Sequence, residues 1–340
     1  MKKLSKVLAL LALTCVWGGV TACSNNSDST PPASPASYKV TFDTDGGTPA
    51  SIAAQTVTSG AKATKPADPT KDGYGSFDWM NGDSVYDFNA PVTSNLNLKA
   101  KWYVGSKKPS VAKSAGDIFF KDGSATAYTA GLTLSDDQKK AAIAVIYKID
   151  GAKAYGVGLV QKQIDNRVKW CLDTANGYNA EITAIQCSCD ETTWNVDSVT
   201  GDADGSDNFA EIGKALGSYD DTGTLSNYPA FEFAINYKDQ KLGAELTSRV
   251  AGTAYENGWY LPSAIELVEI LKKKDSVNNA INLCGGNIID CPSGNFYVPS
   301  SQLTTYSGKD SYILGVDGSD EFPLHTKKEQ GLACAIRVFN

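Results

Sequence analysis

The stretch GWYLPSAIELVEILKKK, residues 258–274, specifies the best-defined helix of the chain. Ser263 and Glu266 have the spacing of a capping box, in which two side chains satisfy backbone N–H groups at a helix start. The residues that follow, from Ala264 to Leu271, are mostly apolar, which predicts that most of this helix is buried. The three lysines at the end of the stretch complement the negative carboxyl end of the helix dipole.

The segments around this helix predict strands and a second helix. Residues 142–149 and 154–161 are apolar, β-branched runs separated by Asp150-Gly151, which predicts a hairpin. A second helix is expected at 229–237, with proline at its first position. Further strands are expected at 295–298, 311–316 and 334–339. Helices between groups of strands favour an α+β fold with an antiparallel sheet for a main domain of residues 107–340.

The N-terminus predicts export and lipid anchoring. Residues 1–22 combine a basic start, an apolar run and a small-residue end in the order of a secretory signal. With Cys23 they resemble the bacterial lipobox, which implies that Cys23 carries acyl chains and needs no spanning helix. Residues 23–37 are polar and rich in proline, so we expect a disordered tether. The expected location is the cell envelope, lipid-anchored and outward-facing on the outer membrane, with the membrane itself as one partner.

Composition fits an exported chain. Without the three lysines of residues 1–22, 28 basic and 38 acidic side chains remain, a formal net charge of −10. So acidic a chain is not expected to bind nucleic acid. Six cysteines remain after Cys15 and Cys23, and in an oxidising compartment they predict up to three disulfides of open connectivity. They are Cys171, Cys187, Cys189, Cys284, Cys291 and Cys334.

Residues 38–103 read as a separate small β-rich module, because alternating strand patterns open and close it. A set of motifs resembles the Listeria–Bacteroides repeat, also called the internalin B-type repeat: Val40-Thr41-Phe42-Asp43, Gly46-Gly47, Pro66 and Pro69, Gly73-Tyr74, Trp79, Phe88 and Pro91, and Lys101-Trp102. Asp78 stands where the family usually has glycine. The resemblance implies a β-grasp-like fold that acts as a stalk or spacer on cell surfaces. Its aromatic residues are expected to form its core.

The motif GWYLPS at 258–263, with Glu266-Leu267 after it, resembles a signature of bacterial proteins with a C-type lectin-like fold, related to the formylglycine-generating-enzyme branch. Matches over much of 115–340 are most similar to spirochaete-type surface lipoproteins such as the treponemal variable protein group. The resemblance implies a surface in the last third of the domain for an extracellular protein or host ligand. In some members a diversity-generating retroelement varies that surface. Residues 306–330 match little, which diversification and ordinary loop drift explain equally well. The ligand-binding residues expected are Val298, Pro299, Gln302, Leu303, Tyr306, Lys309, Phe322 and His325.

An acidic loop at residues 200–211 approaches the spacing of an EF-hand calcium loop. Asp202, Asp204, Ser206 and Glu211 fall at ligand positions, but Thr200 stands at the first position, which is normally Asp. Because Asp and Gly also form ordinary turns, we favour a polar turn and keep calcium as the alternative, with no other cofactor expected.

Enzyme activity is not expected. His325 is the single histidine, so a Ser-His-Asp or Cys-His-Asp hydrolase is disfavoured. A copper site of the related enzyme branch needs paired thiolates, and neither Cys284 with Cys291 nor Cys187 with Cys189 matches its motifs. The sequence thus predicts a surface lipoprotein that displays a domain for ligand binding or adhesion. The alternatives are a structural envelope lipoprotein without a specific ligand or, less favoured, an enzyme of the formylglycine-generating-enzyme-related fold.

Overall fold

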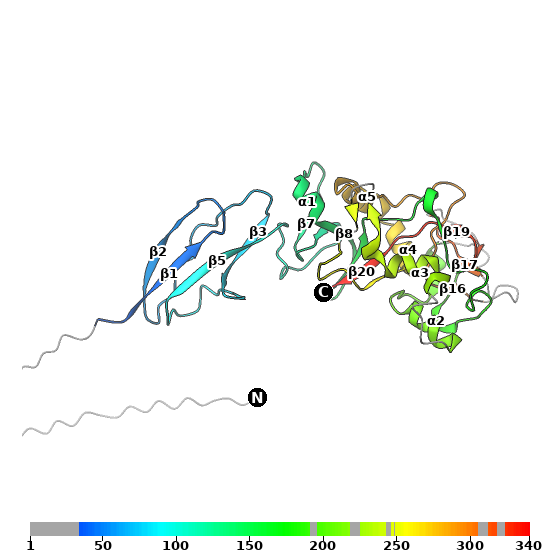
Figure 1. The fold of residues 1–340 in the computed structure, drawn as a ribbon, viewed down its shortest axis with the longest axis horizontal. Helices are drawn as coiled ribbons and strands as arrows, with labels where there is room; N and C mark the ends of the chain where they lie inside the picture. The colour runs from blue at the N-terminus through cyan, green and yellow to red at the C-terminus, as the bar shows by residue number, and fades with distance from the viewer. Residues whose placement is uncertain are drawn as a thin grey trace, which may run out of the picture.

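The computed structural model of the chain describes residues 34–190, 196–217, 225–242, 246–247, 249–304, 312–317 and 324–340 (Figure 1). The signal segment, Cys23 and most of the tether lie outside the described residues, as do Tyr306, Lys309 and Phe322. Figure 1 shows the repeat, in blue and cyan, followed by a larger body that contains every helix of the described part of the chain.

The repeat folds as one five-stranded sheet in the order β2-β1-β5-β3-β4, with β1 Ser37–Asp43, β2 Ile52–Thr58, β3 Ser76–Asn81, β4 Ser84–Val85 and β5 Leu96–Tyr103. The alternation expected at its two ends is confirmed as β1 and β5. These two strands are neighbours and pair in parallel, with Val40 opposite Leu96 and Asp43 opposite Lys99. The alternate residues Val40, Phe42, Leu98 and Ala100 are buried in its core, as the period of two requires.

The main domain contains a six-stranded antiparallel sheet in the order β15-β20-β9-β8-β6-β7. The predicted hairpin is present, although its second strand ends at Gly158. The C-terminal strand lies between β15 and β9, so it joins the hairpin of β8 and β9 to β15 in one sheet. The strands are β6 Asp117–Phe120, β7 Ala125–Ala127, β8 Ala142–Asp150, β9 Lys153–Gly158, β15 Trp259–Tyr260 and β20 Ile336–Phe339.

Within the described ranges, five helices accompany this sheet: α1 Asp136–Ala141, α2 Asn208–Leu216, α3 Pro229–Ile235, α4 Ala264–Leu271 and α5 Lys274–Leu283. The capping box of α4 is confirmed, because Ser263 Oγ accepts from Glu266 N at 3.2 Å and Glu266 Oε2 accepts from Ser263 N at 2.9 Å. The sequence did not predict α5, which begins at Lys274, so the lysine run joins two helices. Strands and helices together confirm the α+β class.

Shorter elements connect these parts. Two-stranded pairs form between β10 Val168–Lys169 and β19 Gln330–Gly331, β13 Lys241–Leu242 and β14 Leu246–Thr247, and β17 Tyr312–Leu314 and β18 Leu324–Thr326. A three-stranded sheet joins β11 Gln186–Ser188 with β12 Thr200–Gly201 and β16 Gln302–Leu303. Turns of 3₁₀ helix lie at Ile164–Asn166, Thr183–Ile185, Val196–Ser198, Leu225–Asn227 and Tyr237–Asp239. The strand expected at 295–298 is reduced to bridges at Tyr297. No helix in the described part of the chain is long and apolar enough to span a membrane.

The repeat and the main domain meet at a joint formed by residues 104–108 with Asp78, Asp122 and Ser124. Backbone N–H groups of Val104 and Gly105 donate to Asp122 Oδ2 and Ser124 Oγ, each at 2.7 Å. Lys108 forms an ion pair with Asp78 of the repeat. Gly105 lies so close to β7 that an added Cβ would stand 2.4 Å from a backbone oxygen there. The Asp78–Lys108 ion pair therefore adds to the backbone bonds that join the two parts.

Candidate functional site

The segment expected to bind a ligand near the C-terminus lies largely inside the main domain. Among the expected residues, Val298, Pro299, Gln302 and Leu303 are buried. The Gln302 carboxamide accepts from Ile182 N at 3.0 Å and donates to Ala180 O at 3.1 Å. The backbone bonds Val298 N to Leu332 O at 2.9 Å and Leu332 N to Phe296 O at 2.8 Å hold the start of the segment in the core. The expectation that these four side chains lie at a surface is therefore corrected: they pack inside the domain. The reason is that partners from distant parts of the chain hold the segment that carries them.

His325 is the one expected ligand-binding residue that the structure describes and leaves partly exposed. Its ring stacks on Phe296 with centroids 3.5 Å apart and an interplanar angle of 10°. Its Nδ1 lies 2.7 Å from Glu329 Oε2. Burial raises the pKa of Glu329, but hydrogen bonds from His325 and Thr326 outweigh it and leave that pKa below its ordinary value. The His325 ring thus has the Phe296 ring on one face and the Glu329 carboxylate at its edge. No nucleophilic side chain is bonded to it in the described part of the chain.

The acidic loop forms a hydrogen-bonded turn. Asp202 Oδ2 accepts from Asn208 Nδ2 and from Ser301 Oγ at 2.9 Å, so this oxygen is already engaged. Asp204 Oδ1 accepts from Ser206 N at 2.9 Å, whereas Glu211 lies in α2. The structure does not bring the four expected calcium ligands together, and its described residues contain no cluster of three or more His, Cys, Asp or Glu that could hold a metal ion.

Beneath this loop lies a buried carboxyl group that the sequence identified only as a helix cap. Glu266 is 1% exposed, and its oxygens accept from Gly205 N at 3.0 Å, Ser263 N at 2.9 Å and Tyr260 Oη at 2.8 Å. Burial raises the pKa of Glu266 to about 7. Through these hydrogen bonds the Glu266 carboxyl connects the acidic loop to the start of α4. Because the group is buried, we assign it a structural role, and its protonation state depends on pH.

The cysteines do not form the expected disulfides in the part of the chain that the structure describes. They are dispersed through the main domain: Cys171 lies near Lys327, Cys284 follows α5 beside Arg249, and Cys334 is almost completely buried. Burial raises the pKa of Cys171, Cys187 and Cys284 to about 12. Thiols in such surroundings stay protonated near neutral pH, so they are poor nucleophiles.

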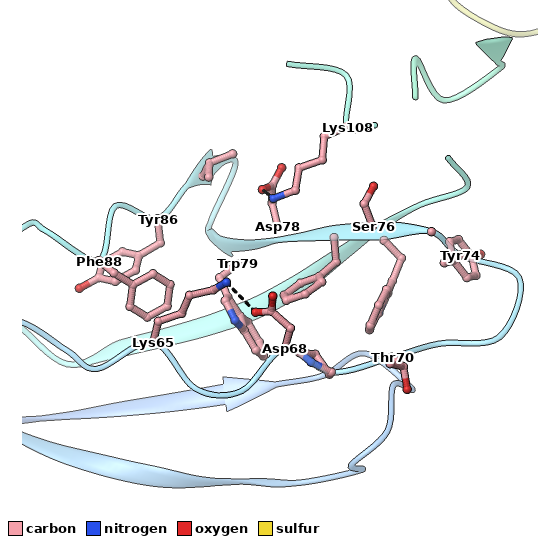
Figure 2. A pocket seen from close by; sticks show the side chains of 15 residues that line it. Lys65, Asp68, Thr70, Tyr74, Ser76, Asp78, Trp79, Tyr86, Phe88 and Lys108 are labelled. Carbon is pink, nitrogen blue, oxygen red and sulfur yellow. Dashed lines mark hydrogen bonds and ion pairs between the residues drawn. The ribbon is translucent and has the colours of Figure 1, made fainter. Parts of the chain in front are cut away.

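A hollow in the repeat brings aromatic and charged side chains together. Its volume is about 430 Å³, and it lies between β3 and the loop that carries Pro69 and Tyr74 (Figure 2). We call it the repeat pocket. It is lined by Lys65, Asp68, Pro69, Thr70, Tyr74, Gly75, Ser76, Phe77, Asp78, Trp79, Val85, Tyr86, Phe88, Trp102 and Lys108.

The lining of the repeat pocket divides into buried and exposed aromatic rings. Trp79 is 3% exposed, as expected of a core residue, whereas Tyr74 is 41% exposed. Tyr74 and Trp102 lie with ring centroids 6.2 Å apart, and Tyr86 meets Phe88 edge to face at 4.9 Å. Sequence reasoning assigned all these aromatics to the core. The exposure of Tyr74 comes from a loop conformation that alternation patterns do not encode.

Two polar atoms around this pocket are buried without a hydrogen-bond partner in the structure. They are Nε1 of Trp79 and the hydroxyl oxygen of Tyr86. Two ion pairs, Lys65 with Asp68 at 2.6 Å and Lys108 with Asp78, contain all the charged residues of the lining. The repeat pocket therefore offers aromatic surface and balanced charge, and two of its lining residues carry a buried polar atom without a hydrogen-bond partner.

The module of β1 to β5 matches a known protein family. Residues 38–101 match the Listeria-Bacteroides repeat domain, over nearly the whole of the module that the strands define. No curated protein matches the chain in sequence. The chain therefore carries, over residues 38–101, a segment similar to a repeat found in bacterial surface proteins.

Proposed function

We propose that the protein is a lipid-anchored bacterial surface protein that holds a ligand-binding or adhesive domain away from the membrane. The observation that carries this proposal is the match of residues 38–101 to a repeat of bacterial surface proteins, directly followed by a larger domain. The repeat then serves as the spacer, and the main domain as the part that meets a partner.

The arrangement of the repeat supports a spacer role. Because β1 and β5 are parallel neighbours, the chain enters at the start of β1 and leaves at the end of β5, at the opposite end of the sheet. The joint that follows fixes the main domain through the bonds of Val104 and Gly105 and the Asp78–Lys108 ion pair. A spacer with a bonded joint transmits its orientation to the domain it presents.

We also propose that the main domain is C-type lectin-like. Its antiparallel sheet, in which β20 lies beside β9 and the strands before it, and its two helices α3 and α4 support this assignment. The ligand surface is proposed to lie around the β17–β18 hairpin, where His325 is partly exposed. Tyr306 and Lys309 precede this hairpin in sequence and Phe322 falls between its two strands; these are the residues we assign to that surface.

The anchoring is tested in a diderm bacterium that expresses the whole chain. Metabolic labelling with an alkyne fatty acid should mark the wild type, whereas Cys23→Ala should be unlabelled and released from the membrane. Protease added to intact cells should remove the main domain of the wild type. Unlabelled wild-type protein, or full protection in intact cells with digestion only after lysis, would contradict surface display.

The adhesive role is tested on the same cells. Adhesion to fibronectin, collagen and mucin coats is compared for the wild type, Tyr306→Ala/Phe322→Ala and a control, Ile149→Ala, which truncates an exposed residue (39%) of β8. We expect adhesion to at least one coat that the double variant loses and the control keeps. Equal adhesion by all three, or by cells without the protein, would refute the assigned surface.

A further inference from the structure

We propose that the repeat pocket is a second binding site and that it takes a neutral, hydroxyl-rich saccharide. The proposal goes beyond the spacer role, because a spacer needs no concave site with exposed aromatic surface. With about 430 Å³, the pocket falls within the usual range for small-ligand sites and has room for one or two sugar rings.

The aromatic walls provide flat apolar faces of the kind that sugar rings contact with their C–H groups. Tyr74, 41% exposed, lies next to the partly exposed Trp102 at the open side. Phe77 packs against Trp102 with centroids 5.2 Å apart and supports it from within. Such rings give a large contact area at a low cost in conformational entropy.

The charges of the lining favour a neutral ligand. Lys65 pairs with Asp68, and Lys108 pairs with Asp78, so the two cations and two anions of the pocket balance. A charged ligand would have to compete with one of these pairs. The side chains of Lys65 and Asp68 are 52% and 60% exposed, so solvent screens their attraction and holds the pair only weakly. Both can therefore turn to donate to, or accept from, ligand hydroxyls at little cost.

The unpartnered polar atoms point to hydroxyl recognition. Nε1 of Trp79 and the hydroxyl of Tyr86 lack hydrogen-bond partners although both atoms are buried. In Figure 2 the indole nitrogen of Trp79 is directed toward the side of the pocket where Lys65 and Asp68 lie. Movement of this weakly held ion pair lets a ligand hydroxyl reach that nitrogen. A buried polar group that gains a partner recovers the cost of having been left unsatisfied.

Part of the backbone around the pocket is already engaged in hydrogen bonds. Gly75 N donates to Tyr103 O at 3.0 Å, and Ser76 Oγ donates to Gly105 O at 2.6 Å. β3 pairs with β5 from Ser76 to Met80, and with β4 at Met80 and Asn81. The groups used in these pairs are not available to a ligand, so hydroxyl contacts at the end of the pocket near the joint come from side chains.

The test uses residues 24–340 with maltotetraose, cellotetraose and N-acetylchitotetraose as probes, in saturation-transfer NMR and in titrations of tryptophan fluorescence. We expect at least one probe to bind. Tyr74→Ala should weaken that binding about fivefold through loss of ring contact, and Asp68→Asn about threefold through loss of a charge-assisted acceptor. Ile149→Ala, an equally exposed truncation on the main domain, should bind as the wild type does. Circular dichroism of each variant verifies folding.

Three results would overturn the inference. These are no binding of any probe by the wild type, equal binding by the wild type and both pocket variants, and displacement of the bound saccharide by a decaproline peptide, which would identify an aromatic groove for proline-rich chains. Because the probes address the repeat, none of these results bears on fatty-acid labelling or protease access, which test the surface role separately.

Discussion

Glu266→Gln should remove a pH dependence of stability that the wild type shows between about pH 5 and pH 8. The carboxyl group is buried, and its pKa is about 7 in the folded chain against an ordinary value of 4.5. Between these two values the folded protein holds a proton that the unfolded chain releases. The free energy of unfolding therefore falls as the pH rises through this window. The stabilisation from the proton on Glu266 is fully present only below the pKa of this group in the unfolded chain.

The magnitude follows from the two pKa values. A folded pKa that lies one pH unit above the unfolded pKa corresponds to about 1.4 kcal/mol, so the wild type should lose on the order of 2.5 kcal/mol between about pH 5 and pH 8 through this group alone. Glutamine has nearly the same shape: its oxygen can accept from Gly205 N and Ser263 N, and its amide faces Tyr260 Oη. It carries no charge to titrate, so its profile should lack this component.

Urea unfolding of residues 24–340, followed by circular dichroism at a series of pH values, measures the effect. Glu269→Gln is the matched control, since it removes a carboxylate of the same helix that is paired with Lys148 near the surface. The difference between wild type and Glu266→Gln should shrink or change sign toward high pH, whereas the control profile should run parallel to the wild type. Parallel profiles for Glu266→Gln as well would refute the reasoning that burial holds this proton.

Three further predictions concern the joint, a buried lysine and the thiols. Gly105→Ala should destabilise the protein by about 1–3 kcal/mol, because its Cβ would stand 2.4 Å from the backbone oxygen of Ala125. An unchanged melting temperature would contradict this and show that the backbone of the joint shifts to accept the Cβ without loss of stability. Lys327→Ala should lower the free energy of unfolding in urea by about 2–4 kcal/mol, because it opens a cavity, removes the buried ammonium that donates to Gly177 O, and takes away one of the two donors to Ala180 O; a loss under about 1 kcal/mol would contradict this. Cys187 and Cys334 should resist a thiol reagent in the folded protein and react after denaturation without reductant; their failure to react then would reveal disulfides.

Local signals were sufficient for several elements. The capping box at Ser263 and Glu266 placed the start of α4 because its information lies within four residues. The turn at Asp150-Gly151 likewise placed the hairpin of β8 and β9. The start of α5 at Lys274 was missed because a lysine run reads as the end of a helix, and no apolar pattern continues through it.

Errors arose where distant residues decide the outcome. Gln302 was expected at a ligand-binding surface because the family resemblance implied one in the last third of the domain, yet its partners Ile182 and Ala180 are more than a hundred residues away and hold it inside. The disulfides were expected from number and compartment, although only spatial proximity permits a bond. The repeat pocket was missed for the same reason, because Tyr74 and Tyr86 line one pocket only through the loops of the folded repeat.

The parallel pairing of β1 with β5 has a mechanical consequence. These strands are the first and last of the repeat, so a pull between the tether and the main domain draws them in opposite directions along their lengths. The hydrogen bonds between them lie across the pulling direction and share the load, so they must break together and cannot open one after another. The repeat should therefore resist extension in shear. Unfolding by a single-molecule pull at its two ends should need far more force than peeling β2 from β1.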